Sequence, residues 1–187
     1  MPGTLENLLS KRDWLLADGA TGTNYFAMGL QSGDAPEMWN ITHPDKVAHL
    51  HHEFIEAGAD IILTNSSGGS SYRLKLHQAQ DRVTELNCAA AQIARQTADN
   101  ASRTVLVAGS IGPTGEFLEP NGTASEDEMF KIFADQAKGL AEGGVNAFCV
   151  ETMSDMAETS LAIRAAKETT GLPVMATLTF DQGPVPY

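Results

Sequence analysis

Positive charge is scarce in this sequence. Its 187 residues include 12 lysines and arginines against 24 aspartates and glutamates, which gives a formal net charge of −12. Proteins that bind nucleic acids or anionic membrane surfaces gather Lys and Arg on the contacting face. We therefore expect neither a nucleic acid nor a membrane as a partner.

The sequence also lacks a long hydrophobic run and has few cysteines. No stretch reaches the roughly 18 apolar residues of a membrane-spanning helix. The first residues (MPGTLE) show neither the basic nor the apolar region of a secretion signal. Cysteine occurs only at Cys88 and Cys149, which we interpret as free thiols of a cytoplasmic protein.

What the sequence does contain is a repeated pattern of short apolar runs that end in small or polar residues. We predict five buried strands from these runs, separated by helices. The predicted strands are 15–17, 60–65, 104–108, 145–150 and 173–179. The predicted helices cover about 42–58, 81–98, 125–143 and 154–171, with apolar residues three and four apart. This alternation predicts a parallel sheet with right-handed crossovers.

Two α/β architectures fit the alternation, a doubly wound open sheet and a (β/α)8 TIM barrel. All strands of a barrel contribute to one site, whereas an open sheet concentrates its site at one switch point. Because every predicted strand here ends in small or polar residues, we favour the barrel. A complete barrel takes about 250 residues, so this chain would supply the first five β/α units. We accordingly predict that residues 1–187 are the amino-terminal portion of one barrel domain.

Two carboxylates directly follow predicted strands, Asp18 after the first and Glu151 after the fourth. In a barrel both would face the mouth, where they could hold an ammonium group or act as acid and base. Acids at strand ends also commonly cap a neighbouring turn or helix, and this alternative stays open. Cys149 lies two residues before Glu151 and is predicted to share its face.

Two polar segments follow other predicted strands. Asn65, with Ser66 and Ser67, could donate hydrogen bonds to a ligand or satisfy the local backbone. Segment 109–115 (GSIGPTG) has a glycine at every third position. Its N–H groups could bind an anion, or its glycines could serve turns with positive φ. The segment is neither a P-loop nor a dinucleotide-binding fingerprint.

Three histidines, His49, His51 and His52, fall within one predicted helix. Their order differs from the H-E-x-x-H pattern, which places two histidines one turn apart with an acid between them. We interpret them as part of a solvated helix face rather than as metal ligands.

Four segments together resemble the homocysteine S-methyltransferase family, which includes betaine–homocysteine methyltransferases and the homocysteine domain of cobalamin-dependent methionine synthase. In order, they are 17–23 (ADGATGT), 57–65 (AGADIILTN), 107–115 (VAGSIGPTG) and 150–152 (VET). The resemblance covers essentially the whole chain. Segment 35–40 (APEMWN) is most similar to bacterial members of the betaine and methionine synthase types.

The resemblance implies a (β/α)8 barrel that moves a methyl group from a small donor, betaine-like or of the methylfolate type, to homocysteine, forming methionine. The implied partners are homocysteine and this donor, and a homo-oligomer is compatible with the resemblance. By position, Asp18 and Glu151 match the acids that hold the homocysteine amino group. The amides of Gly19 and Ala20 match those that receive its carboxylate, and Asn65 is expected in the same substrate site.

The resemblance also implies zinc, held by three cysteine thiolates, which lowers the pKa of the homocysteine thiol. Those cysteines come from later strands, and neither Cys88 nor Cys149 matches them. We therefore expect the zinc ligands outside this chain and no activity from the chain alone. Ser66 and Ser67 also replace a usual aromatic residue. Two alternatives remain, a non-catalytic fragment that binds an amino acid or a partner, and another enzyme that binds an anion at 109–115.

Overall fold

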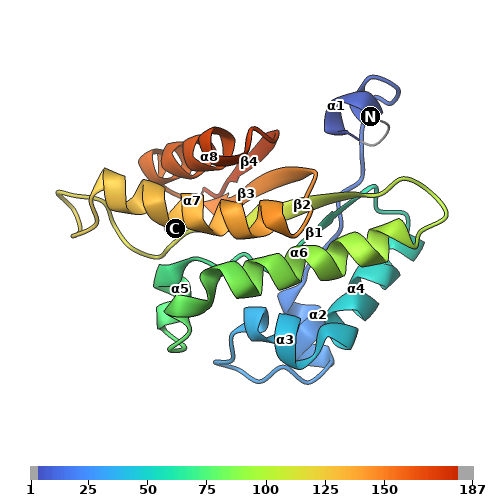
Figure 1. Cartoon of the computed structure of the whole chain (residues 1–187), viewed down its shortest axis with the longest axis horizontal. Coiled ribbons are helices and arrows are strands. Elements are labelled where there is room, and N and C mark those ends of the chain that lie inside the picture. The colour runs from blue at the N-terminus through green and yellow to red at the C-terminus, as the bar shows by residue number, and fades with distance from the viewer. Residues whose placement is uncertain (1–3, 181–187) are drawn as a thin grey trace, which may run out of the picture.

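The computed structural model describes residues 4–180, which form one parallel sheet flanked by helices (Figure 1). The sheet has four strands in the order β1-β2-β3-β4, all parallel. Their bounds are β1 (Ile61–Leu63), β2 (Leu106–Ile111), β3 (Ala147–Met153) and β4 (Val174–Leu178). Strands that are neighbours in the sheet are thus consecutive in the sequence, as the alternating pattern predicted.

Four long helices alternate with these strands. They are α4 (Pro44–Glu56), α6 (Val83–Asp99), α7 (Glu126–Glu142) and α8 (Met156–Thr170). The shorter elements are α1 (Leu5–Leu9), α2 (Gly22–Ala27), η1 (Pro36–Met38), α3 (Trp39–Thr42), α5 (Ser71–Lys75) and η2 (Gln80–Arg82).

The caps explain why the predicted helix bounds are close to the observed ones. At the start of α7, the Ser125 hydroxyl accepts the Glu128 N–H at 3.2 Å. At the end of α8, Gly171 adopts the left-handed conformation with φ +72°. All four predicted helices are therefore confirmed.

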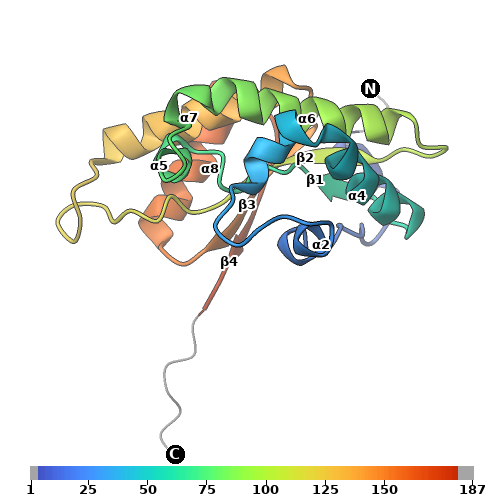
Figure 2. The same cartoon turned by 90° about the horizontal axis from the view of Figure 1, so that it is seen from below.

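The long helices all lie on one side of the sheet (Figure 2). α4 packs against α6, α6 against α7 and α7 against α8, so the helices follow one another around the outside of the strands. A doubly wound sheet has helices on both faces, whereas a barrel has them only outside. The arrangement is that of part of a barrel and confirms the favoured architecture.

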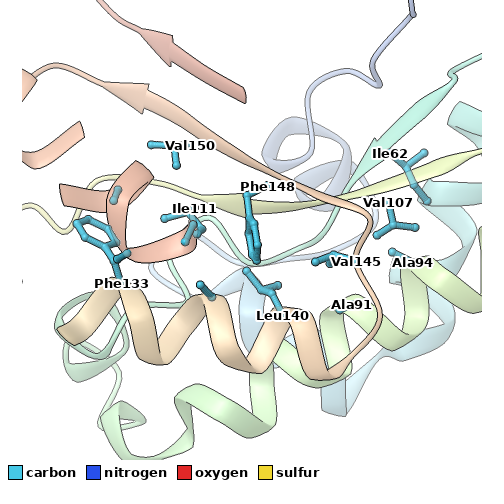
Figure 3. Close-up of a cluster of buried hydrophobic side chains, with 14 of the residues drawn as sticks. Ile62, Ala91, Ala94, Val107, Ile111, Phe133, Leu140, Val145, Phe148 and Val150 are labelled. Atoms are coloured by element: carbon cyan, nitrogen blue, oxygen red, sulfur yellow. The ribbon is translucent and has the colours of Figure 1, made fainter. Parts of the chain in front are cut away.

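The main core fills the space between the sheet and these helices (Figure 3). Val107 of β2 and Phe148 and Val150 of β3 are fully buried on this outer face. Phe133 and Leu140 of α7 pack in the same cluster and are also fully buried. Side chains packed at this density hold each strand in register against its helix.

The inner face of the strands carries a smaller apolar cluster. Its buried members are Leu5, Ile61, Leu106, Ala108, Ala147 and Cys149. Side chains alternate between the two faces of a strand. The residues that follow on the inner face, toward the carboxyl ends, are therefore Ser110 of β2 and Glu151 of β3, and the face changes there from apolar to polar.

The structure corrects the number of strands. Residues 15–17, predicted as the first of five strands, form only a single parallel bridge, between Ala17 and Ile61. Within residues 4–180 the sheet thus has four strands. The prediction of a first buried strand is wrong in this respect, although the segment does lie beside β1.

Carboxylates explain why the pairing beside β1 stops after one bridge. On one side of it, Asp60 accepts the Leu16 N–H at 2.9 Å. On the other side, Asp18 accepts the Leu63 N–H at 2.8 Å. In a longer ladder these N–H groups would bond to backbone carbonyls. The second of these bonds also fixes Asp18 at the carboxyl end of β1.

The three histidines of α4 have different environments. His49 and His52 are exposed, as predicted, but His51 is only 2% exposed. Its Nε2 atom has no hydrogen-bond partner among the described residues, and burial lowers the His51 pKa to about 4. The prediction of a solvated face is wrong for His51, because it lies one helical turn from both Val47 and Ile55 on the buried side.

Within residues 4–180, no helix has both the length and the apolar content that crossing a membrane requires.

Candidate functional site

A cavity of about 740 Å³ lies at the carboxyl ends of the strands. It brings together all the substrate residues that the sequence predicted, namely Asp18, Gly19, Ala20, Asn65 and Glu151. Residues from the inner face of the sheet, including Ser110, Cys149 and Thr177, complete its floor. Since these residues come from segments far apart in the sequence, only the parallel arrangement of the strand ends assembles them.

Asp18 is held at the cavity wall by the hydrogen bond from Leu63 N–H. Burial, with a smaller contribution from the nearby charge of Glu151, raises the Asp18 pKa to about 7, although the Leu63 hydrogen bond opposes the shift. Asp18 therefore titrates close to neutral pH. Two acids that resist being charged together form a site suited to a cationic group.

Glu151 is held by a hydroxyl from the neighbouring strand. The Ser110 hydroxyl donates a short hydrogen bond to Glu151 Oε1. Ser110 is itself anchored, because its N–H donates to Thr64 Oγ1 at 2.9 Å and its carbonyl accepts from Ser66 Oγ at 2.8 Å. The hydroxyl-rich end of β1 thus fixes the orientation of Glu151 through Ser110.

The backbone next to Glu151 is irregular. The pairing of β3 with β4 shifts register between Val150 and Met153, and Thr152 adopts a positive φ of +60°. A β-branched residue seldom adopts this conformation, which costs of the order of 1–3 kcal/mol. The Thr152 N–H donates to Thr177 Oγ1 at 3.3 Å, from the next strand. A bulge of this kind redirects the side chain beside it, here Glu151.

Gly19 and Ala20 contribute two backbone amides to the cavity lining. Neither N–H makes a hydrogen bond with another described residue, and both residues are exposed. A side chain at position 19 would place its Cβ 3.1 Å from Phe54 Cε1, so the position favours glycine. These two N–H groups remain available to an acceptor that enters the cavity.

Asn65 lines the cavity, but its side chain bonds to the protein. Its Nδ2 donates to the Pro36 carbonyl at 2.8 Å and to Asn40 Oδ1 at 3.0 Å. In return, Asn40 Nδ2 donates to the Asn65 carbonyl at 2.8 Å. These bonds tie segment 36–40 to the end of β1 and support the local role that the sequence left open. Direct binding by Asn65 stays a prediction.

Sequence reasoning missed several residues of the cavity. Ser110 and Thr177 could have been found from strand alternation, since they follow Ala108 and Met175 on the inner face. Glu37 gave no such signal, because it lies in the short helix η1 and reaches the cavity only through tertiary packing. It is 6% exposed, and its Oε1 accepts the Gly68 N–H at 2.7 Å.

The glycine-rich segment 109–115 already has internal acceptors. The Gly112 N–H donates to the Ser67 carbonyl at 2.9 Å. The Thr114 N–H and hydroxyl donate to Glu158 Oε1 at 2.8 and 2.6 Å. Only Gly115 of its three glycines has a positive φ. The carboxylate of Glu158 thus occupies the place that an anionic ligand would need.

The described residues do not fit the zinc site that the resemblance implied. Within residues 4–180 no group of three or more His, Cys, Asp or Glu side chains is arranged to hold a metal ion. Both cysteines are free, and only Cys149 lines the cavity. Burial raises the Cys149 pKa to about 11, so this thiol stays protonated at neutral pH.

The sequence profile of the family described as "Homocysteine S-methyltransferase" matches residues 15–185. The chain belongs to this family. The match includes all five predicted substrate residues, so the homocysteine S-methyltransferase profile spans the whole cavity described above.

Curated relatives of the chain include two methionine synthases. The chain is 32% identical to the enzyme of Mycobacterium tuberculosis (strain ATCC 25618 / H37Rv) over 191 aligned positions, which cover 95% of the chain and 16% of that protein. It is 29% identical to the enzyme of Mycobacterium leprae (strain TN), covering 82% of the chain and 13% of that protein. The chain thus corresponds to a small part of these relatives.

Solved structures similar to the chain include the homocysteine methyltransferase MmuM from Escherichia coli. Its metallated form superposes with a TM-score of 0.75 and 25% identity, covering 94% of this chain and 66% of MmuM. The oxidised form gives a TM-score of 0.74 and 26% identity, covering 65% of MmuM. The chain therefore shares the fold of MmuM along nearly all of its own length but spans slightly less than two thirds of that enzyme.

Proposed function

We propose that this chain is the homocysteine-binding part of a homocysteine S-methyltransferase, and that residues 1–187 form the amino-terminal portion of one barrel domain. The observation that carries the proposal is the pairing of two acids with two free amides around one cavity. Asp18 and Glu151 supply the acids, and Gly19 and Ala20 supply the amides. An α-amino acid presents the complementary pair, an ammonium group and a carboxylate.

In the proposed complex the homocysteine ammonium lies between Asp18 and Glu151, and its carboxylate accepts hydrogen bonds from Gly19 and Ala20. The ammonium favours the charged form of Asp18, whose pKa in the free protein is raised to about 7. Binding therefore releases a proton from Asp18. We expect homocysteine affinity to rise about tenfold between pH 6 and pH 8, following the ionised fraction of a group with this pKa.

Isothermal titration calorimetry under reducing conditions at pH 8 tests this binding mode. We expect Asp18→Asn and Glu151→Gln to weaken homocysteine binding at least about tenfold, since each removes a charge that contacts the ammonium. Glu53→Gln is the matched control, because it makes the same change of charge at an exposed site on α4. 4-Mercaptobutyrate lacks the amino group and 3-mercaptopropylamine lacks the carboxylate, so both should bind much more weakly. Equal binding of all three ligands would contradict the proposal.

The reaction that we propose for the complete enzyme is transfer of a methyl group from a small donor to homocysteine, which yields methionine. The described residues lack a three-ligand metal set, and neither cysteine of the chain matches the implied zinc ligands. We therefore expect the purified 187-residue chain to bind homocysteine without forming methionine. Methionine production from homocysteine by this chain alone, with glycine betaine or methyltetrahydrofolate, would show the expectation to be wrong.

The anion-binding alternative gains no support from the site. Its amides at 112 and 114 donate to Ser67 and Glu158, as described above. Inorganic phosphate should accordingly give no protection against thermal unfolding, whereas homocysteine should raise the melting temperature.

A further inference from the structure

Gln136 of α7 is a polar side chain in an apolar environment. It is fully buried, and Phe133 and Leu140, one helical turn before and after it, belong to the main core (Figure 3). Its Oε1 atom has no hydrogen-bond partner among the described residues. A buried amide with an unpaired oxygen destabilises a protein relative to an apolar side chain of similar shape. Packing alone therefore does not account for a glutamine at this position.

The one side-chain hydrogen bond of Gln136 within residues 4–180 joins α7 to the segment that follows β1. Its Nε2 donates to the Ser66 carbonyl at 2.7 Å. The same carbonyl accepts the Gly69 N–H at 2.8 Å, so it would keep a partner without Gln136. The bond from Gln136 is thus not needed to satisfy this carbonyl, but it anchors Ser66 to the helix.

Ser66 in turn belongs to a closed ring of hydrogen bonds with Thr64 and Ser110. The Ser66 hydroxyl donates to the Ser110 carbonyl at 2.8 Å, and the Ser110 N–H donates to Thr64 Oγ1 at 2.9 Å. The hydroxyl oxygens of Thr64 and Ser66 lie 2.6 Å apart. Since the Ser66 hydrogen points to the carbonyl, Thr64 supplies the hydrogen between the two hydroxyls. All three residues are buried, so a displacement of Ser66 also displaces Ser110.

The Ser110 hydroxyl lies outside this ring and donates to Glu151 Oε1. This is the one hydrogen bond of the Glu151 carboxylate within residues 4–180. A continuous path of hydrogen bonds therefore runs from Gln136 through Ser66 and Ser110 to Glu151. It connects the helical layer outside the sheet with the cavity on the inner side.

We propose that Gln136 is a positioning residue for Glu151, which acts through Ser66 and Ser110 and so sets the affinity of the cavity for the ammonium group of an amino acid. The inference rests on the proposed function, because Glu151 is one of the two acids assigned to the homocysteine ammonium there. A purely structural role would make Gln136 contribute to stability, whereas a positioning role makes it contribute to binding. The two roles thus predict different results for an apolar replacement.

Gln136→Met separates the two roles in the 187-residue chain. Methionine has a similar length, and it removes both the bond to Ser66 and the unpaired oxygen. We expect the free energy of unfolding, measured by urea denaturation, to stay at or above the wild-type value. Homocysteine affinity, measured by calorimetry at pH 8 under reducing conditions, should fall about fivefold, because Glu151 is less firmly oriented.

Asn87→Leu is the matched control. Asn87 is a fully buried amide of α6 with an unpaired Oδ1 atom. Its Nδ2 donates to the Gly69 carbonyl at 2.8 Å, so it contacts the same segment without joining the path to Glu151. We expect this variant to be less stable than the wild type, since the Gly69 carbonyl loses a donor. Its homocysteine affinity should change less than about twofold.

A double-mutant cycle with Glu151→Gln shows whether Gln136 acts through Glu151. Glu151→Gln removes the charge that is positioned, so adding Gln136→Met should weaken homocysteine binding less than about twofold further. A full fivefold further loss would overturn the path through Glu151. Wild-type affinity in Gln136→Met itself would overturn the positioning role, and lower stability with that affinity would assign Gln136 a purely structural role.

A measurement without ligand separates this inference from the proposed function. The carboxyl carbon resonance of Glu151, identified by its loss from the NMR spectrum of Glu151→Gln, reports the hydrogen bonding of this carboxylate. We expect it to shift in Gln136→Met and to stay in place in Asn87→Leu. No shift in Gln136→Met, or an equal shift in both variants, would overturn the inference. A wild-type chain that does not bind homocysteine would count against the proposed function, while the resonance would still decide whether Gln136 positions Glu151.

Discussion

The two faces of the sheet are built for different purposes, and β3 contributes to both. Its outward residues Phe148 and Val150 lie in a fully buried apolar cluster beneath the helices. Its inward residues Cys149 and Glu151 line a polar cavity. The side chains of the outer face are apolar and closely packed, whereas the inner face has partly buried carboxylates, amides without a partner and a strained backbone. Residues that stabilise the fold and residues that line the cavity thus alternate along the same strand.

The two regions also respond to acid in opposite ways. Asp18 on the inner face has a pKa raised from 3.8 to about 7. The folded chain therefore binds a proton more readily than the unfolded chain, and Asp18 lowers stability as the pH rises through this window. His51 on the helical side has a pKa lowered from 6.5 to about 4. Its contribution to stability is present above pH 6.5 and is lost as the pH falls toward 4.

Truncating neighbouring residues of β3 should give the largest contrast between the two faces. Phe148→Ala leaves a cavity in the outer core and should lower the free energy of unfolding by about 3–5 kcal/mol. Cys149→Ala, on the inner face, should cost about 1 kcal/mol or less, since it removes one sulfur at the edge of an existing cavity. Urea denaturation at pH 7.5 measures both. Similar losses for the two variants would mean that the inner face is packed as firmly as the outer one.

The second largest effect should come from His51. We expect the free energy of unfolding of the wild-type chain to fall by about 1 kcal/mol for each pH unit below pH 6. The reason is that the buried imidazole of His51 has no partner among the described residues and takes up a proton only on unfolding. His51→Phe cannot titrate and should remove this part of the pH dependence. His49→Phe is the control, since His49 is exposed on the same helix. Parallel pH profiles for wild type and His51→Phe would contradict the assignment.

Asp18→Asn should have a smaller effect on stability, and of the opposite sign. The asparagine oxygen still accepts the Leu63 N–H, but no charge is buried at high pH. We expect the variant to melt a few degrees above the wild type at pH 8, with the difference shrinking as the pH falls toward 4. At the same concentration, homocysteine should raise the melting temperature of the wild type more than that of the variant. A variant less stable than the wild type at pH 8 would show that the charge of Asp18 does not destabilise the protein in the absence of homocysteine.

Much of the difference between the packed outer face and the polar inner face could be predicted from the sequence. The positions of the helices and of β1 to β4 follow from the spacing of apolar residues. Parallel strands place their carboxyl ends at one edge, so Asp18 and Glu151 were expected to meet in one cavity. Alternation along β3 likewise predicted that Cys149 shares the face of Glu151.

The rest depended on contacts between distant segments. The pairing beside β1 is limited to one bridge because Asp60 and Asp18 accept N–H groups that a longer ladder would pair with backbone carbonyls. Glu37 reaches the cavity because Asn65 and Asn40 bind its segment to the end of β1. His51 looked solvated only because histidine is polar. The spacing of His51 from Val47 and Ile55 could have placed it on the buried side of its helix. The contacts of Asp60, Asp18 and Glu37, in contrast, join parts of the chain that only the fold brings together.

The smallest effect that we expect concerns the strained turn beside Glu151. Thr152→Gly removes the penalty for a β-branched residue at φ +60°, so it should raise the free energy of unfolding by about 0.5–1 kcal/mol. Thr152→Ala keeps a Cβ and should bring little or no gain. Because the Thr152 N–H still bonds to Thr177 in both variants, homocysteine affinity should change less than about threefold. Chemical denaturation and calorimetry measure the two quantities. If glycine instead destabilised the chain more than alanine does, the left-handed turn would be a relaxed part of the fold, and the inner face would not carry the strain that distinguishes it from the outer one.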